Sequence, residues 1–201
     1  MIRAITFDLD GVYFVNGKSN FIKNLAEFGV PESEVAEVFF KSDQMNTLYK
    51  TGAMTDEEFW SWALNEWSLT LTVREIIKLL IDGYETNHRV VDVVKAVREN
   101  GYKTLACSNN FHARIQGLQD KFGFLENFDA AIMSYEIGVT KPSEEIFKAL
   151  IDRSGVSAGE IVFADDDESK LSGAKSLGIQ TVFYEGFDAF LYSLGELGVN
   201  I

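Results

Sequence analysis

Five short runs of apolar residues lie along the chain, separated by longer segments of mixed character. None of the runs alternates cleanly between apolar and polar residues, which is typical of strands buried on both faces of a parallel sheet. Helical patterns lie between them: Val90, Val93, Val94 and Val97 share one helix face, and Gly101 follows as a helix stop. This order of elements predicts an α/β fold with an open, mostly parallel sheet. The predicted strands are residues 2–7, 103–107, 130–134, 161–164 and 181–184.

The interval between the first two strands has a different character. From about residue 19 to residue 84 only helical patterns occur, and such an interval is too long for a single crossover helix. We therefore expect a small, all-helical domain at residues 15–85, inserted into a core domain formed by residues 1–14 and 86–201. The helical patterns of the insertion cover residues 20–28, 33–41, 56–68 and 72–84.

The charge and composition of the chain limit the kinds of molecule and compartment that suit the protein. The chain has 18 Lys and Arg against 31 Asp and Glu, so its formal net charge of −13 argues against binding nucleic acid or an anionic membrane. Cys107 is the single cysteine, which rules out an internal disulfide and suits a reducing compartment. The first apolar run is too short for a signal peptide, and no segment approaches the roughly 20 apolar residues of a membrane span. We expect a cytoplasmic protein; the sequence leaves its oligomeric state open.

Two carboxylates follow the first predicted strand. Asp8 and Asp10 are two positions apart, so their side chains can face the same site, and Gly11 then permits a sharp turn. Ligands of open α/β sheets bind beyond the carboxyl ends of the strands. A divalent cation is the natural way to keep two such close carboxylates ionised. The alternative is an acidic loop with a turn-forming Asp-Gly pair.

Polar residues also follow the other strands. Ser108 and Asn109 come after the second strand and can donate hydrogen bonds to phosphate oxygens, although Ser and Asn are also common helix N-caps. Lys141 precedes Pro142, which favours an extended backbone there, and it either neutralises an anion or lies in solvent. The fourth strand ends in four consecutive acids at 165–168, which either bind a cation or begin a helix.

With these four groups of polar residues in this order along the sequence, the chain resembles the haloacid-dehalogenase-like hydrolase superfamily. The matching stretches are Phe-Asp-Leu-Asp-Gly-Val at 7–12, Leu-Ala-Cys-Ser-Asn at 105–109, Val-Thr-Lys-Pro at 139–142 and Val-Phe-Ala-Asp-Asp at 162–166. The resemblance implies a Rossmann-like core with a helical cap. It also implies a magnesium-dependent phosphatase that hydrolyses a small phosphorylated metabolite through an aspartyl-phosphate intermediate.

The resemblance assigns a role to each matching residue. Asp8 would attack phosphorus, and Asp10 would protonate the leaving oxygen and later activate water. Mg²⁺ would be bound by the Asp8 carboxylate, the backbone carbonyl of Asp10, and Asp166, with Asp165 assisting. An acid at position 10 favours phosphate esters, because dehalogenases of the superfamily lack one there. The residues that would bind the phosphoryl oxygens are Ser108, Asn109 and Lys141.

Two other functions remain open from the sequence, a sugar-phosphate mutase and a non-catalytic phosphate-binding or signalling relative. Lys170 stands where many relatives have Asp or Asn, and pairing with Asp166 or Asp167 would weaken support for the metal. Tyr13 and Phe14 are expected in a mobile flap where they could touch substrate. Lys50 lies near the turn of the insertion, either in solvent or against an anionic substrate.

Overall fold

A five-stranded parallel sheet forms the core of the computed structural model, which describes residues 1–201. The strand order is β5-β4-β1-β6-β7, so the first strand occupies the centre, and the predicted α/β fold with a parallel sheet is confirmed. Each predicted strand is present within about two residues of its expected ends. The strands are β1 (Ala4–Phe7), β4 (Lys103–Ser108), β5 (Ala130–Met133), β6 (Ile161–Asp165) and β7 (Gln180–Phe183).

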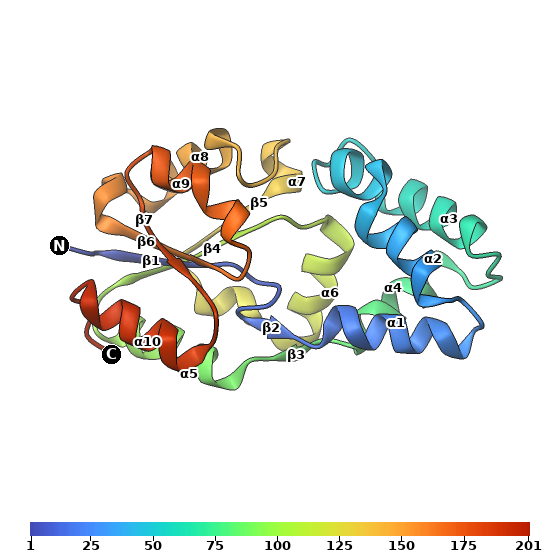
Figure 1. Cartoon of the computed structure of the whole chain (residues 1–201), viewed down its shortest axis with the longest axis horizontal. Coiled ribbons are helices and arrows are strands. Elements are labelled where there is room, and N and C mark those ends of the chain that lie inside the picture. The colour runs from blue at the N-terminus through green and yellow to red at the C-terminus, as the bar shows by residue number, and fades with distance from the viewer.

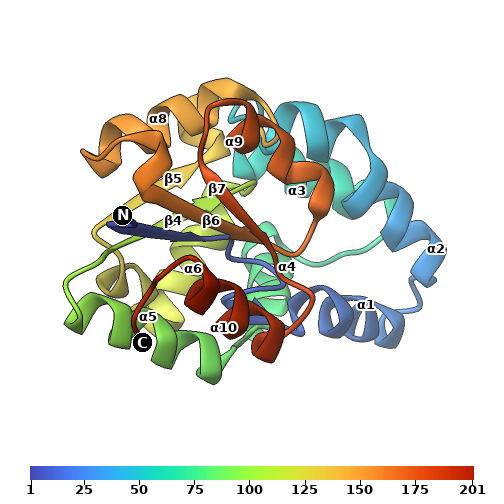
Figure 2. The same cartoon turned by 60° about the vertical axis from the view of Figure 1, so that its left-hand side comes forward.

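Helices cover both faces of this sheet (Figure 1, Figure 2). Ile5 and Phe7 belong to one buried cluster with residues of α5 (His88–Glu99), α6 (His112–Phe122) and α10 (Phe187–Glu196). Ala4 belongs to a second cluster with residues of α8 (Glu144–Ser154) and α9 (Ser172–Ser176). Because both faces of the sheet are covered by helices, side chains that point to either face are buried, and successive positions of a strand are apolar. Shorter helical segments are η3 (Phe124–Asn127), α7 (Ser134–Ile137), η4 (Ala158–Glu160) and η5 (Glu168–Leu171).

The residues between β2 and β3, numbers 16–84, form a helical insertion that contains no strand, as predicted. It lies beyond the carboxyl ends of the core strands (Figure 1). The predicted helix at 33–41 is in fact an α-helix followed directly by a π-helix, and a second π-helix comes shortly after it. The elements are α1 (Gly17–Glu27), α2 (Glu32–Val35), η1 (Ala36–Lys41), η2 (Gln44–Tyr49), α3 (Asp56–Glu66) and α4 (Val73–Asp82).

A short antiparallel ribbon joins the insertion to the core. It pairs β2 (Phe14–Val15) with β3 (Glu85–Thr86), and the proposed domain boundaries fall inside it. The expectation of a flap at Tyr13 and Phe14 is wrong, because these side chains are only 1% and 0% exposed and their rings pack against Phe124. The two aromatic residues therefore belong to the buried core beside the ribbon and are not accessible to a substrate. None of the helices combines the length and apolar character that crossing a membrane requires.

Candidate active site

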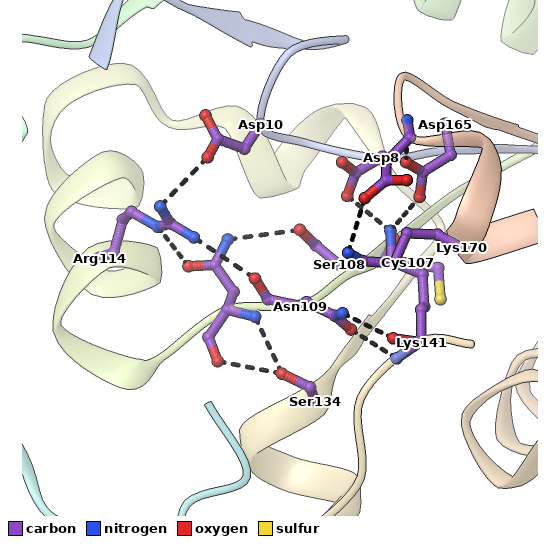
Figure 3. Close-up of polar contacts among 12 residues, drawn as sticks. Asp8, Asp10, Cys107, Ser108, Asn109, Arg114, Ser134, Lys141, Asp165 and Lys170 are labelled. Atoms are coloured by element: carbon purple, nitrogen blue, oxygen red, sulfur yellow. Dashed lines mark hydrogen bonds and ion pairs between the residues drawn. The ribbon is translucent and has the colours of Figure 1, made fainter. Parts of the chain in front are cut away.

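The residues singled out in the sequence meet at the carboxyl edge of the sheet. Asp8 directly follows β1, Ser108 is the last residue of β4, and Asp165 is the last residue of β6. The Asp8 N–H donates to the Ala164 carbonyl at 2.9 Å, so the backbone of Asp8 is still held by the neighbouring strand. Figure 3 shows Asp8, Asp165 and Lys141 pointing toward one another at this edge. Rigid strands therefore position these side chains.

Lys141 is the buried centre of this group, with 3% of its surface exposed. Its Nζ donates to Asp8 Oδ1 at 2.8 Å, to Asp165 Oδ2 at 2.6 Å and to the Cys107 carbonyl at 2.9 Å. Asn109 fixes the backbone of Lys141, because its Oδ1 accepts the Lys141 N–H at 2.7 Å and its Nδ2 donates to the Lys141 carbonyl at 3.0 Å. Burial lowers the pKa of Lys141, but Asp8 and Asp165 outweigh it and raise the pKa. The lysine is a permanent buried cation, and the solvent alternative is wrong.

Three carboxylates in this group can share a metal ion. One oxygen from each of Asp8, Asp165 and Asp166 lies within 4.8 Å of the others. Burial and the charge of Asp8 raise the pKa of Asp165 and of Asp166, as expected for buried carboxylates close to one another. Gly11 has a φ of +96°, and a Cβ there would lie 2.0 Å from Asp166 Oδ2. The turn after β1 thus needs glycine to let Asp166 approach, and the oxygen-only donor set suits Mg²⁺.

The Asp10 carboxylate does not join these three acids and turns toward α6 (Figure 3). Its Oδ2 lies 2.8 Å from Lys18 Nζ and 3.3 Å from Arg114 Nη1. Burial raises the pKa of Asp10, but Arg114 and Lys18 outweigh it and lower the pKa below its usual range. This orientation is compatible with a metal contact through the Asp10 backbone carbonyl, which stays a prediction.

Arg114 is the main residue of the site that sequence reasoning missed. It is 3% exposed, and its guanidinium donates to Asn110 Oδ1 at 2.6 Å and to Tyr84 Oη at 2.8 Å. Asn110 in turn is held by Ser134, whose Oγ accepts the Asn110 N–H at 2.9 Å. A single arginine in a helical segment carries no sequence signal that separates it from a surface residue. Only its buried contact with Asp10 reveals it.

A cavity of about 340 Å³ opens above these residues, between the core and the insertion. Lys50 lines it and is partly buried, so of the two alternatives left open for this lysine the structure favours the one in which it faces the cavity. Lys170 also lines it, but its Nζ pairs with Asp167 Oδ2 at 2.9 Å and leaves Asp166 free of an ion pair. The insertion supplies Lys18, Phe39, Phe40, Met45, Asn46 and Lys50 to the cavity wall.

Residues 2–178 match the family model for haloacid dehalogenase-like hydrolases. An uncharacterised protein of Dictyostelium discoideum is 31% identical over 153 residues, and the match covers 74% of this chain but only 66% of that protein. D-ribitol-5-phosphate phosphatase of Bacteroides thetaiotaomicron is 24% identical over 193 residues, which cover 90% of this chain and 91% of that enzyme.

Solved structures show the same fold. An aspartate-to-alanine variant of a haloacid dehalogenase family enzyme from Bacteroides thetaiotaomicron, in complex with magnesium and inorganic phosphate, superposes with a TM-score of 0.82. It has 22% sequence identity, and the superposition covers 96% of this chain and 99% of that chain. With a family match that extends over most of its residues, this chain belongs to the haloacid dehalogenase-like hydrolase family.

Proposed function

We propose that this chain is a magnesium-dependent phosphatase that cleaves a small phosphorylated metabolite through an aspartyl-phosphate at Asp8. One observation carries the proposal. The Asp8 carboxylate lines a cavity of about 340 Å³, is bonded to a buried lysine and lies close to two further carboxylates. Phosphoryl transfer requires positioning and charge neutralisation above all, and this arrangement supplies both.

Asp8 is placed to act as the nucleophile. Its Oδ1 is bound to Lys141, and no residue hydrogen-bonds its Oδ2, which leaves that oxygen able to attack phosphorus. A bond forms between Asp8 and phosphorus while the bond from phosphorus to the leaving oxygen breaks. Ser108 ends β4, Asn109 follows it, and both line the cavity with Asp8. We assign Ser108, Asn109 and Lys141 to the phosphoryl oxygens.

Asp10 serves as the acid and then the base. In its protonated form it gives its proton to the leaving oxygen as the first bond breaks. In the second step the ionised carboxylate takes a proton from the water that attacks phosphorus, and Asp8 is released with inorganic phosphate. Lys18 and Arg114 favour the ionised form and hold it beside the cavity, which suits the second step.

The residues present fit a magnesium ion. We assign Asp8, Asp166 and the backbone carbonyl of Asp10 as its ligands, with Asp165 supporting them while it also holds Lys141. When bound, Mg²⁺ would supply positive charge against the phosphoryl oxygens and against the carboxylates themselves. A related family enzyme has been solved in complex with magnesium and inorganic phosphate, which supports magnesium as the metal.

The substrate class follows from the site and from the relatives. A curated relative of nearly the same length is named D-ribitol-5-phosphate phosphatase, which favours a phosphate ester of a small polar carbon chain. Asp10 has a leaving oxygen to protonate in such an ester and none in a haloacid, so dehalogenation is disfavoured. A mutase would use the same core residues but would return the phosphate to its substrate.

The experiment that tests the function is a screen of small phosphate esters, D-ribitol 5-phosphate and p-nitrophenyl phosphate included, for release of inorganic phosphate. We expect phosphate to accumulate with turnover. Formation of an isomeric sugar phosphate without phosphate release would instead establish a mutase. The absence of both, in a folded protein supplied with Mg²⁺, would leave only a binding function.

Removal of divalent metal is expected to lower the rate of phosphate release by at least about 100-fold, since metal ions supply several kcal/mol of charge stabilisation. Added Mg²⁺ should restore the rate. Mg²⁺ should also raise the unfolding temperature of the wild-type protein, because it binds only the folded state. Asp166→Asn should lose most of that rise. A rate that is unchanged after chelation would contradict the metal site.

A further inference from the structure

One basic side chain of the cavity forms no ion pair. Four of its five basic side chains are in ion pairs, as the distances above show: Lys141 with Asp8 and Asp165, Lys18 and Arg114 with Asp10, and Lys170 with Asp167. Lys50 alone has no acidic oxygen within 4.0 Å, although it lines the cavity. Asp166 also forms no ion pair, but the proposed metal ion would neutralise it. Nothing in the proposed function neutralises Lys50.

Lys50 is held in place by its surroundings. Its carbonyl accepts a hydrogen bond from Ser134 Oγ at 2.5 Å, which ties the end of η2 to the core. The following turn lies against the core as well, because a Cβ on Gly52 would be 2.4 Å from the Tyr135 carbonyl oxygen. The Lys50 side chain therefore enters the cavity from a backbone fixed at the junction of insertion and core.

The ammonium group of Lys50 is oriented by Asn46. Asn46 Nδ2 donates to the carbonyls of Phe40 and Ser42 at 2.8 Å and 3.1 Å, so the amide cannot rotate freely. Its Oδ1 accepts from Lys50 Nζ at 2.9 Å. An ammonium carries three N–H donors, and this contact uses only one of them. The other two are left for a ligand.

The position is electrostatically unfavourable unless an anion binds there. Burial lowers the pKa of Lys50 most strongly. The positive charges of Arg114 on α6, Lys18 on α1 and Lys170 on η5 lower it further, whereas Asp10 opposes the shift. The pKa of Lys50 falls to about 7 as a result. Because an unpaired, partly buried charge is costly, the ammonium form of Lys50 is weakened without an anion beside it and is stabilised when an anion binds.

We propose that Lys50 binds a second anionic group, a carboxylate or a second phosphate, on the leaving portion of the substrate. The inference rests on the proposed function. In the proposed function, Lys141 and the metal ion neutralise the phosphate that binds at Asp8. Residues of the insertion then contact the leaving portion of the substrate. Phe39, Phe40 and Met45 line the cavity with Lys50 and can pack against the carbon chain between the two anions. A volume of about 340 Å³ lies at the small end of the range for ligand pockets and suits a small substrate.

The test compares substrates that differ only in the second group. 3-Phosphoglycerate and glycerol 3-phosphate differ by a carboxylate against a hydroxymethyl group, and ribulose 1,5-bisphosphate and ribulose 5-phosphate differ by a phosphate. We expect wild-type kcat/KM to favour the anionic member of one pair. Lys50→Met should reduce kcat/KM for that member about 10- to 100-fold more than for its partner, as expected for a hydrogen bond between charged groups. Lys50→Arg should keep the preference.

Controls separate this inference from the proposed function. Lys78→Met removes another lysine of the insertion, one that is exposed and pairs with Asp82, and should leave both preferences unchanged. Calorimetric binding of both pairs to wild-type and Lys50→Met protein needs no turnover, so it decides the inference even if phosphate is never released. Equal losses for both members, or no anionic preference in the wild type, would overturn it.

The preference should also depend on pH. Lys50 is protonated below its pKa of about 7, so the kcat/KM ratio within the favoured pair should fall as pH rises through about 7. The ionisation of the shared phosphate cancels in this ratio. Lys50→Arg should remove the fall, because arginine stays charged. A ratio that keeps the same pH dependence in Lys50→Arg would show that another group is responsible.

Discussion

Asp8→Asn is expected to reduce kcat/KM for phosphate release by at least about 10⁴-fold, the scale of loss when an enzyme's nucleophile is removed. Asparagine keeps the size of aspartate, but its amide cannot form the acyl-phosphate bond. The measurement is steady-state phosphate release with Mg²⁺ present, together with mass spectrometry of the wild-type protein quenched in acid during turnover. The quenched wild-type protein should carry one phosphoryl group on Asp8, and the variant should carry none.

The substitution should leave the fold intact. Lys141 keeps its bonds to Asp165 and to the Cys107 carbonyl, at 2.6 Å and 2.9 Å, and the crowding of three carboxylates is relieved. Circular dichroism and thermal unfolding provide the control. Turnover by Asp8→Asn at a rate near that of the wild type would reject Asp8 as the nucleophile. A phosphoryl group found on another residue would do the same.

Much of the core could be predicted because its signals are local. Each strand of the sheet is visible in the sequence as a short apolar run, and β1, β4 and β6 end in or are followed by a polar residue of the site. Parallel topology then brings those ends together without further information. The hinge ribbon gave no such signal, because strands of two residues have no measurable periodicity. Tyr13 and Phe14 were misassigned for the same reason.

The part of the cavity wall that the insertion and α6 supply could not be fixed from the sequence, which left Lys50 with two alternatives and missed Arg114, because it depends on how the insertion packs against the core. Lys50 and Arg114 are far apart in sequence, and each looks like a surface residue in its own helical segment. Their burial arises only when η2 contacts Ser134 and α6 lies beneath Asp10. The residues proposed to set specificity therefore depend on long-range contacts, whereas the reaction class can be inferred from short motifs.

Lys141→Met is expected to lower the free energy of unfolding by about 3–5 kcal/mol at pH 7, the usual cost of removing one partner from a buried ion pair. Methionine fills a similar volume, but Asp8 and Asp165 then face each other, 7% and 1% exposed, without the ammonium that neutralises both. Activity should be lost as well. Urea unfolding in metal-free buffer measures the effect.

Acid should partly restore the stability of Lys141→Met. Burial and the charge of Asp8 already raise the pKa of Asp165 in the folded protein, and without Lys141 that pKa rises further. A carboxyl whose folded-state pKa exceeds its unfolded value destabilises the protein at high pH, and the penalty disappears as pH falls through the folded-state pKa. The gap between wild type and variant should therefore be smaller at pH 5 than at pH 8.

Lys170→Met is the matched control, because Lys170 pairs with Asp167 near the surface, where the two side chains are 29% and 47% exposed. Its loss should cost no more than about 1 kcal/mol. Mg²⁺ should also recover part of the stability of Lys141→Met, since two positive charges among the same oxygens replace the missing one. If Lys141→Met is as stable as Lys170→Met at pH 8, the carboxylates are neutralised by some means other than this lysine, and the charge arrangement on which the phosphatase proposal depends is wrong.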